Sequence, residues 1–136
     1  MERTLVIVKP DGVERGLIGE IIGRFEAEGL RLVAADFRSI DRESAERHYV
    51  EHVGKPYYEP LVEFIARGPS LLVVLEGPSG TLHLVRGLIG ATNPAEAEAG
   101  TIRADFASST RENLVHGSDS PESAHREIAI FFPHLT

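Results

Sequence analysis

Near the start of the chain stands Thr4-Leu5-Val6-Ile7-Val8, and the turn sequence Lys9-Pro10-Asp11-Gly12 follows it directly. An unbroken run of apolar and β-branched residues is typical of a strand that is covered on both faces of its sheet. Proline fixes φ and glycine tolerates unusual dihedral angles, so the strand is expected to end in a turn after Val8. This segment therefore predicts a central strand of a layered fold.

The rest of the chain alternates between strand-like and helix-like patterns. Further strands are expected over residues 30–40, 70–76 and 113–117. Apolar residues at helical spacing predict helices over residues 17–25, 41–54, 58–65, 82–89 and 121–131. The second of these would turn Ala45, Tyr49 and Val53 toward the interior. The order predicts an α/β or α+β layered sandwich, and periodicity alone leaves parallel and mixed sheets open.

Residues 91–110 have no sustained period and are expected to form a long loop. Loops of more than about 12–15 residues are usually functional or disordered. This one contains apolar residues such as Ile102 and Phe106, which a flexible linker would not need. A functional loop is therefore the better interpretation.

The composition restricts the class of protein. A chain of 136 residues with 42% hydrophobic content predicts one domain over residues 1–136. Its formal net charge of −7 argues against a nucleic-acid or anionic membrane surface, which would need clustered Lys and Arg. The absence of cysteine excludes disulfides, cysteine-zinc sites and thiol nucleophiles. No signal-peptide or membrane segment is evident, so a cytoplasmic protein is expected.

The common phosphate-binding loops are missing, because the chain has neither a Walker A sequence nor a dinucleotide fingerprint. One metal pattern is present in His48-Tyr49-Val50-Glu51-His52, which matches H-x-x-E-H. Two histidines one helical turn apart could bind zinc if a third ligand came from elsewhere. The same residues could equally form an exposed polar helix face.

A second histidine lies in Asn113-Leu114-Val115-His116-Gly117-Ser118-Asp119-Ser120, between a short strand and a capped helix start. Helix N-termini favour anions, and an imidazole near neutral pH keeps a lone pair that can act as a nucleophile. Glu127 on the following helix could accept from the other ring nitrogen and fix the tautomer. Without further information, a turn histidine satisfied by hydrogen bonds fits this pattern as well.

Lys9, Arg86 and Arg103 stand at the edges of expected elements. A polyphosphate would be repelled by the net negative charge unless local cations outweighed it, and guanidinium groups suit phosphate oxygens. Each residue alone is most simply a solvated surface charge. Together with His116 they form a candidate anion site.

Six segments in order along the chain resemble the nucleoside diphosphate kinase family, and the resemblance runs from Thr4 to about Phe132. The last of them, His-Gly-Ser-Asp-Ser preceded by Asn, is highly specific. The segments are Lys9-Pro10-Asp11-Gly12-Val13, His48-Tyr49, Lys55-Pro56-Tyr57-Tyr58, Thr92-Asn93-Pro94, Gly100-Thr101-Ile102-Arg103 and 113–120.

The resemblance implies an α+β fold, a ferredoxin-like βαββαβ sandwich with a four-stranded antiparallel sheet and additional helices. It also implies a phosphotransferase that moves the γ-phosphoryl of a nucleoside triphosphate, typically ATP, to a nucleoside diphosphate. The route would be ping-pong through a phosphohistidine at His116, with broad base specificity and with Mg²⁺ bridging phosphate oxygens.

The resemblance also implies roles for individual residues. Phosphates would be bound by Lys9, Arg86 and Arg103, with a hydroxyl contact from Thr92. Asn113 would bind the sugar. Tyr49 would lie beside the phosphates, while Glu127 and Ser118 would support His116. The base would stack on Tyr57 and pack near Leu61, and such stacking is worth roughly 1–3 kcal/mol for any base.

The sequence departs from the family pattern at three places. Tyr57 stands where most members have Phe, so its hydroxyl needs a partner, and the segment 77–86 is one residue longer than usual. The chain ends at Thr136 like bacterial-type members, for which a homotetramer or a homohexamer is expected.

Two other functions remain open on the same residues: an idle nucleotide-binding module and a histidine phosphocarrier with a protein donor.

Overall fold

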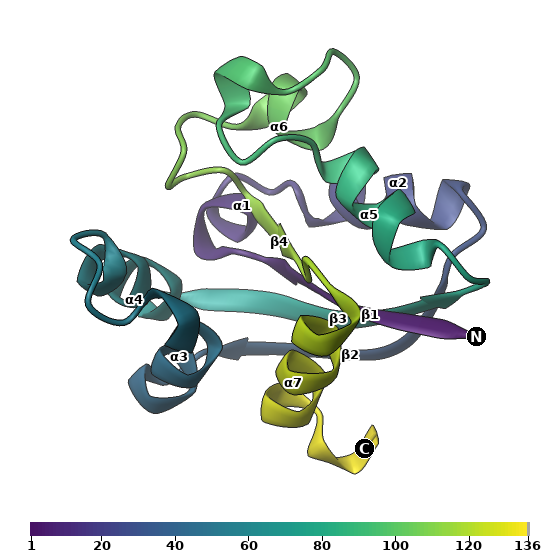
Figure 1. Cartoon of the computed structure of the whole chain (residues 1–136). Coiled ribbons are helices and arrows are strands. Elements are labelled where there is room, and N and C mark those ends of the chain that lie inside the picture. Colours follow the sequence, from purple (N-terminus) through teal and green to yellow (C-terminus); the bar gives the residue numbers. More distant parts are fainter. Residues whose placement is uncertain (136) are drawn as a thin grey trace.

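The computed structural model describes residues 1–135 (Figure 1). Four strands form one sheet in the order β2-β3-β1-β4, and every neighbouring pair is antiparallel. The elements of the described chain are β1 (Glu2–Val8), α1 (Pro10–Glu14), α2 (Ile18–Ala27), β2 (Arg31–Ser39), α3 (Arg42–His48), the 3₁₀ helix η1 (Val50–His52), α4 (Tyr58–Ala66), β3 (Pro69–Gly77), α5 (Thr81–Ile89), η2 (Pro94–Glu96), α6 (Ile102–Phe106), β4 (Val115–Gly117), α7 (Pro121–Phe131) and η3 (Pro133–Leu135).

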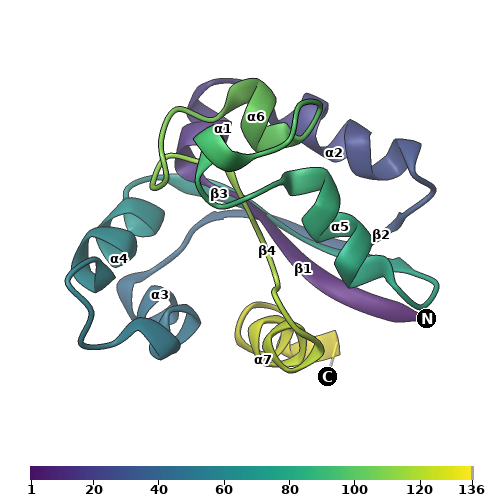
Figure 2. The ribbon, with the colours of Figure 1, turned by 45° about the horizontal axis from the view of Figure 1, so that its top comes forward.

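The central strand β1 divides two hydrophobic cores. Successive side chains of a strand point to opposite faces, so Leu5 and Ile7 pack with α3, α4 and α7. Val6 and Val8 pack on the other face with α2, α5 and α6. All four side chains are fully buried. Figures 1 and 2 show the two groups of helices on opposite faces of the sheet. The prediction of a central strand covered on both sides is thereby confirmed.

The connectivity is that of the ferredoxin-like α+β sandwich with additional helices, as the family resemblance implied. The all-antiparallel pairing is neither the parallel nor the mixed arrangement that periodicity left open. Asp41 and Ser120 cap α3 and α7 as expected, because their side chains accept from Ser44 and Ser123 backbone N–H groups. Among residues 1–135 there is no helix with the length and hydropathy that a membrane span requires.

The expected helix over residues 41–54 is wrong in its second half. The α-helix ends at His48, and the chain tightens into the 3₁₀ helix η1 before it reverses at Gly54, whose φ is +89°. Ala45 and Tyr49 are buried as expected, but Val53 is 61% exposed. The glycine reversal and the following Lys55-Pro56 break the 3.6-residue period, so Val53 no longer continues the buried stripe.

Two segments that were expected to be irregular contain short helices. Pro10 stands at the start of α1, and Pro94 at the start of η2, because the fixed φ of proline suits the first helical turn. Within residues 91–110, Thr101 caps α6 through the backbone N–H of Ala104. Helices of three to five residues are too short to show a hydrophobic period, so the sequence could not reveal them.

Candidate active site

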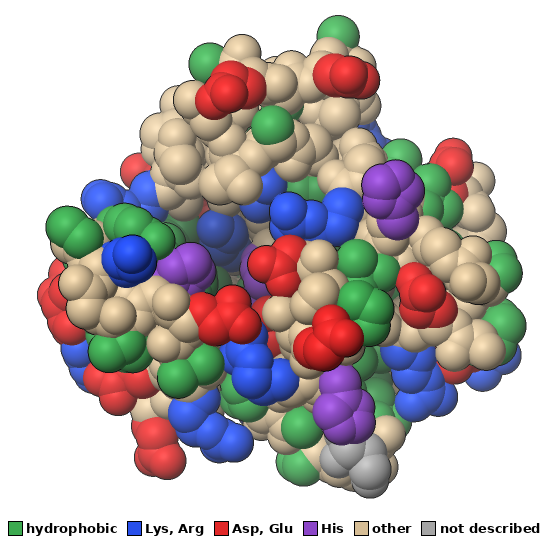
Figure 3. Space-filling model, viewed as in Figure 1, with side chains coloured by type: hydrophobic (Ala, Val, Ile, Leu, Met, Phe, Trp, Pro, Cys, Tyr) green, Lys and Arg blue, Asp and Glu red, His purple; other side chains and the backbone are tan. Residues whose placement is uncertain are grey.

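A cavity of about 510 Å³ opens beside β4, between the segment that carries α6 and the segment from α3 to α4. Figure 3 shows Lys and Arg side chains gathered around this hollow, with histidine side chains inside it. Ten of the eleven predicted site residues line the cavity: Lys9, Tyr49, Tyr57, Leu61, Arg86, Thr92, Arg103, Asn113, His116 and Glu127. The eleventh, Ser118, is buried directly behind Glu127.

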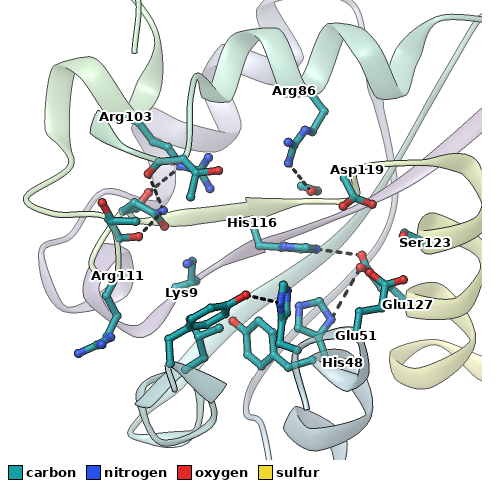
Figure 4. A pocket seen from close by; sticks show the side chains of 18 of the residues that line it. Lys9, His48, Glu51, Arg86, Arg103, Arg111, His116, Asp119, Ser123 and Glu127 are labelled. Atoms are coloured by element: carbon teal, nitrogen blue, oxygen red, sulfur yellow. Dashed lines mark hydrogen bonds and ion pairs between the residues drawn. The ribbon is translucent and has the colours of Figure 1, made fainter. Parts of the chain in front are cut away.

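His116 lies in the middle of β4, opposite Ile7 of β1. Its Nε2 lies 2.9 Å from Oε1 of Glu127, which comes from α7 (Figure 4). The hydroxyl of Ser118 donates to the same carboxylate oxygen at 2.7 Å. The carboxylate therefore orients the imidazole and keeps the proton on Nε2, so that Nδ1 carries the lone pair.

Glu127 is ionised in this arrangement. Burial alone would raise the pKa of its carboxyl, but the charge and hydrogen bond of His116, with the Ser118 hydroxyl, hold that pKa below its ordinary value. The side chain is 4% exposed, so its orientation is fixed by these contacts rather than by water. The result is a rigid acceptor for the Nε2 proton of His116.

His48 forms the wall behind His116. The two rings meet edge to face with centroids 4.5 Å apart, and His48 Nδ1 lies 4.0 Å from Oε2 of Glu127. Burial, and then the neighbouring His116, lowers the pKa of His48 to about 3, so its ring is neutral at physiological pH. A neutral ring adds packing without placing a second cation beside His116.

Three cations border the reactive ring from the other side. Lys9 follows β1, Arg86 lies on α5, and Arg103 lies on α6 (Figure 4). Within the described residues none of them forms an ion pair with a carboxylate. Burial, then repulsion from Arg103, lowers the pKa of Lys9 to about 8. Burial, then repulsion from Arg86, lowers the pKa of Arg103 to about 10. Asp11 only partly offsets the lowered pKa of Lys9, so the cations around the ring favour a polyanionic ligand.

Backbone carbonyls orient two of these guanidinium groups. Arg103 donates to the carbonyl oxygens of Gly90, Asn113 and Val115 at 3.1, 3.4 and 2.6 Å. Arg86 donates to the carbonyl of Gly117 at 3.2 Å. Carbonyl acceptors fix the direction of each guanidinium but leave its charge intact.

The segment before His116 is shaped by Asp11, a residue that was not assigned a role from sequence. Its carboxylate accepts from the backbone N–H of Leu114 at 3.0 Å. Leu114 has a φ of +75°, a conformation that costs about 1 kcal/mol or more for a non-glycine residue. Lys9 N–H donates to the Leu114 carbonyl at 2.8 Å. Gly12 is needed here, since a Cβ would lie 2.9 Å from Cγ1 of Val8 and 3.1 Å from that carbonyl oxygen.

Asn113 is buried at the inner edge of the cavity. Its amide nitrogen donates to the carbonyls of Thr92 and Thr110 at 3.1 and 2.8 Å. Its Oδ1 is buried and has no hydrogen-bond partner among the described residues. An unpaired buried acceptor is costly, and a donor that reached this oxygen after a small side-chain movement would remove that cost.

Tyr57 and Leu61 stand at the mouth of the cavity, at the start of α4. Tyr57 is 42% exposed, and its hydroxyl shares a hydrogen bond of 3.1 Å with Nδ1 of His52. The partner that this hydroxyl requires is therefore supplied by the chain itself.

Tyr49 is buried, and burial, followed by the charge of Glu127, raises the pKa of its phenol above its ordinary value.

The H-x-x-E-H pattern does not form one metal site in this structure. His48 points toward Glu127, His52 contacts Tyr57, and Glu51 lies 3.6 Å from Arg126. The alternative of an exposed polar face is also wrong for His48, which is 5% exposed. Among residues 1–135, the three potential ligands that lie within 4.8 Å of one another are His48, His116 and Glu127. The helix ends at His48, so the two histidines do not share a helical face.

Comparisons with known proteins agree with this geometry. The family described as "Nucleoside diphosphate kinase" matches residues 2–136. A nucleoside diphosphate kinase of Parafrankia sp. (strain EAN1pec) is 56% identical over 135 residues, covering 99% of this chain and 98% of that protein. One of Listeria welshimeri is 57% identical over 135 residues, covering 98% and 91%.

Solved structures show the same relationship. The Halobacterium salinarum nucleoside diphosphate kinase, solved in complex with CDP, has a TM-score of 0.93 and 49% identity, covering 96% of this chain and 87% of that one. The Aquifex aeolicus nucleoside diphosphate kinase has a TM-score of 0.94 and 42% identity, covering 98% and 96%. With a family match over nearly its whole length, the chain belongs to the nucleoside diphosphate kinase family.

Proposed function

We propose that this nucleoside diphosphate kinase works by a ping-pong route in which Nδ1 of His116 accepts the γ-phosphoryl group of ATP. The observation that carries the proposal is the pairing of Nε2 with Glu127 inside a cavity bordered by three cations. The Nδ1 lone pair attacks the γ-phosphorus, the bond to the bridging oxygen breaks, and ADP leaves. A terminal oxygen of a second nucleoside diphosphate then attacks that phosphorus, and the nitrogen–phosphorus bond breaks.

Lys9, Arg86 and Arg103 are proposed to bind the phosphates, with Thr92 adding a hydroxyl contact. Phosphoryl transfer depends mainly on positioning and on neutralising charge that develops on phosphate oxygens. The support is electrostatic. The pKa values of Lys9 and Arg103 are lowered, and among the described residues neither side chain has a carboxylate within ion-pairing distance. A polyphosphate would relieve that repulsion.

Mg²⁺ is proposed as the metal, bound mainly through the phosphates. Mg²⁺ prefers oxygen ligands and commonly uses one or two carboxylates together with substrate phosphates and water. The residues fit this requirement: Asp119 lines the cavity with an exposed carboxylate, whereas Glu127 is already engaged by His116 and Ser118. When bound beside Asp119, the ion would neutralise charge on the phosphate oxygens.

The nucleoside is proposed to lie between Asn113 and the mouth of the cavity. The unpartnered Oδ1 of Asn113 can accept from a sugar hydroxyl. The exposed ring of Tyr57 offers a face on which any base can stack, with Leu61 beside it. Broad base specificity follows, because the Tyr57 hydroxyl is already engaged by His52.

The function is tested with wild-type protein, ATP, Mg²⁺ and a second nucleoside diphosphate. We expect one acid-labile phosphoryl group per chain after incubation with MgATP, and parallel double-reciprocal lines when both substrates are varied. Intersecting lines with no labelled protein would contradict the ping-pong route. Binding of ADP without any turnover would instead identify an idle nucleotide-binding module.

Glu127→Gln is expected to lower kcat by about 10- to 100-fold, with little effect on ADP affinity. The amide is neutral, so its oxygen is a weaker acceptor for His116 and Ser118, and its NH2 group can instead donate to the ring and favour the other tautomer. Steady-state kinetics and calorimetric titration with ADP measure the two effects. The control is Glu122→Gln, an exposed change in the first turn of the same helix. An unchanged kcat in Glu127→Gln would refute the orienting role.

Three broader expectations remain proposals. Residues 1–136 are proposed to act as one domain in the cytoplasm, and the chain is proposed to form a homotetramer or homohexamer. The exposed apolar side chains of Leu32 and Phe37 on the edge strand β2 support association, because such edges readily pair with other chains. Light scattering would measure the number of subunits.

A further inference from the structure

A continuous series of rings connects the reactive histidine with the mouth of the cavity. His116 contacts His48 with centroids 4.5 Å apart, and His48 contacts Tyr49 at 4.7 Å. Tyr49 lies 6.2 Å from His52, which lies 5.4 Å from Tyr57. His52 is thus the one member of the series that joins the buried rings to the exposed one.

The contact between His52 and Tyr57 has two parts. The rings meet at an interplanar angle of 61°, and the Tyr57 hydroxyl and His52 Nδ1 share a hydrogen bond of 3.1 Å. The backbone between them is folded back by Gly54 at positive φ and by the bond from Lys55 N–H to the His52 carbonyl at 3.0 Å. The side-chain contact therefore closes a short, well-defined turn.

Among residues 1–135, Tyr57 has no other ring contact and no other side-chain hydrogen bond. It is 42% exposed, and the neighbouring Val53 is 61% exposed, so packing on this side of the turn is sparse. If the ring became ordered only when a ligand stacked on it, the loss of side-chain freedom would weaken binding. A ring that is already held in place avoids this loss. The same hydrogen bond occupies the hydroxyl, so the ring presents its face rather than a polar group that could select one base.

We propose that His52 is a positioning residue for nucleotide binding, which holds the Tyr57 ring ready to stack on the base through the hydrogen bond to its hydroxyl. This inference rests on the proposed function, because it assigns the base to the Tyr57 ring. It predicts that loss of His52 weakens ligands that carry a base and leaves ligands that consist only of phosphate unaffected.

The experiment compares His52→Ala, Tyr57→Phe and the double variant by calorimetric titration with ADP and with inorganic diphosphate. We expect His52→Ala to raise the Kd of ADP by roughly 2- to 10-fold, the range that corresponds to ordering one side chain, and to leave the Kd of diphosphate unchanged. Tyr57→Phe removes the same hydrogen bond, so the double variant should bind ADP no more weakly than either single variant. Val53→Ala, an exposed change in the same turn, is the control and should bind both ligands as wild type does.

Three results would overturn the inference. One is an unchanged Kd of ADP in His52→Ala, and another is an equal loss of diphosphate affinity, which would indicate a general effect on the cavity. The third is a further loss from His52→Ala in the Tyr57→Phe background, which would show that His52 does not act through the hydroxyl. Since binding is measured without turnover, a wild-type protein that binds ADP but transfers no phosphoryl group would contradict the proposed function alone.

Discussion

Replacement of His116 by alanine is expected to abolish labelling by MgATP and to lower nucleotide phosphorylation by at least about 10⁴-fold, as the loss of a nucleophile does in other enzymes that form covalent intermediates. The imidazole supplies the Nδ1 lone pair, and no other ring in the cavity has the same combination of properties. His48 is buried behind it, and the Nδ1 of His52 is engaged by Tyr57.

The His116→Ala substitution should impair phosphoryl transfer but not nucleotide binding. Lys9, Arg86 and Arg103 are retained in His116→Ala, so ADP should still bind and raise the melting temperature. His83→Ala, an exposed change on α5, is the matched control and should label like wild type. Phosphate that remains on His116→Ala at the wild-type level would mean that a different side chain is the nucleophile.

The second large effect is expected at Lys9. Replacement by methionine removes the ammonium but keeps a chain of similar length, which can pack beside Phe64, whose ring centroid lies 5.8 Å from Lys9 Nζ. We expect kcat/KM to fall by about 10²- to 10³-fold, because one preorganised positive group facing the phosphates is lost. Lys55→Met, an exposed change at the only other lysine, should have no comparable effect.

The same variant is expected to be more stable than wild type in the absence of nucleotide. The pKa of Lys9 is about 8 in the folded protein and 10.5 in the unfolded chain, so folding disfavours the charged form by up to about 3 kcal/mol. This cost is fully present below pH 8, where the amine is charged in both states. It is lost as the pH rises from 8 through 10.5, and above that pH the amine is neutral in both states.

Urea denaturation of Lys9→Met and wild type at several pH values measures this difference. The stability gained by the variant should be largest below pH 8 and should shrink steadily above it. Part of the gain will be offset at Asp11, because burial raises the pKa of that carboxyl and the charge of Lys9, which opposes this rise, is lost in the variant. If Lys9→Met were less stable than wild type at pH 7, the charged Lys9 amine would not destabilise the folded protein, contrary to this prediction.

Sequence reasoning was most successful where one local pattern determined the structure. Five consecutive apolar or β-branched residues defined β1, and Asp41 and Ser120 defined two helix starts. The expected contact between Glu127 and a ring nitrogen of His116 is present at 2.9 Å. In each case the signal lay within or shortly after a recognisable motif, and Glu127 follows His116 by 11 positions.

The sequence was least informative where residues distant along the chain act together. Nothing in the pattern around His48 showed that it would be buried against His116, 68 positions later. The link from Asp11 to the Leu114 backbone spans 103 positions and was missed for the same reason. Asp11 stands inside a quoted motif, so a search for a partner of that carboxylate could have suggested its role.

The site draws its groups from almost the full length of the polypeptide: Lys9 follows the first strand, and Glu127 belongs to the last long helix. During synthesis the antiparallel neighbours β2 and β3 are made early, whereas Glu127, the acceptor for the His116 proton, is added 11 residues after His116. A growing chain therefore contains the nucleophile His116 before it contains Glu127, which orients the imidazole. Chains that stop before Glu127 should therefore transfer phosphoryl groups poorly, and activity should rise once α7 has been added.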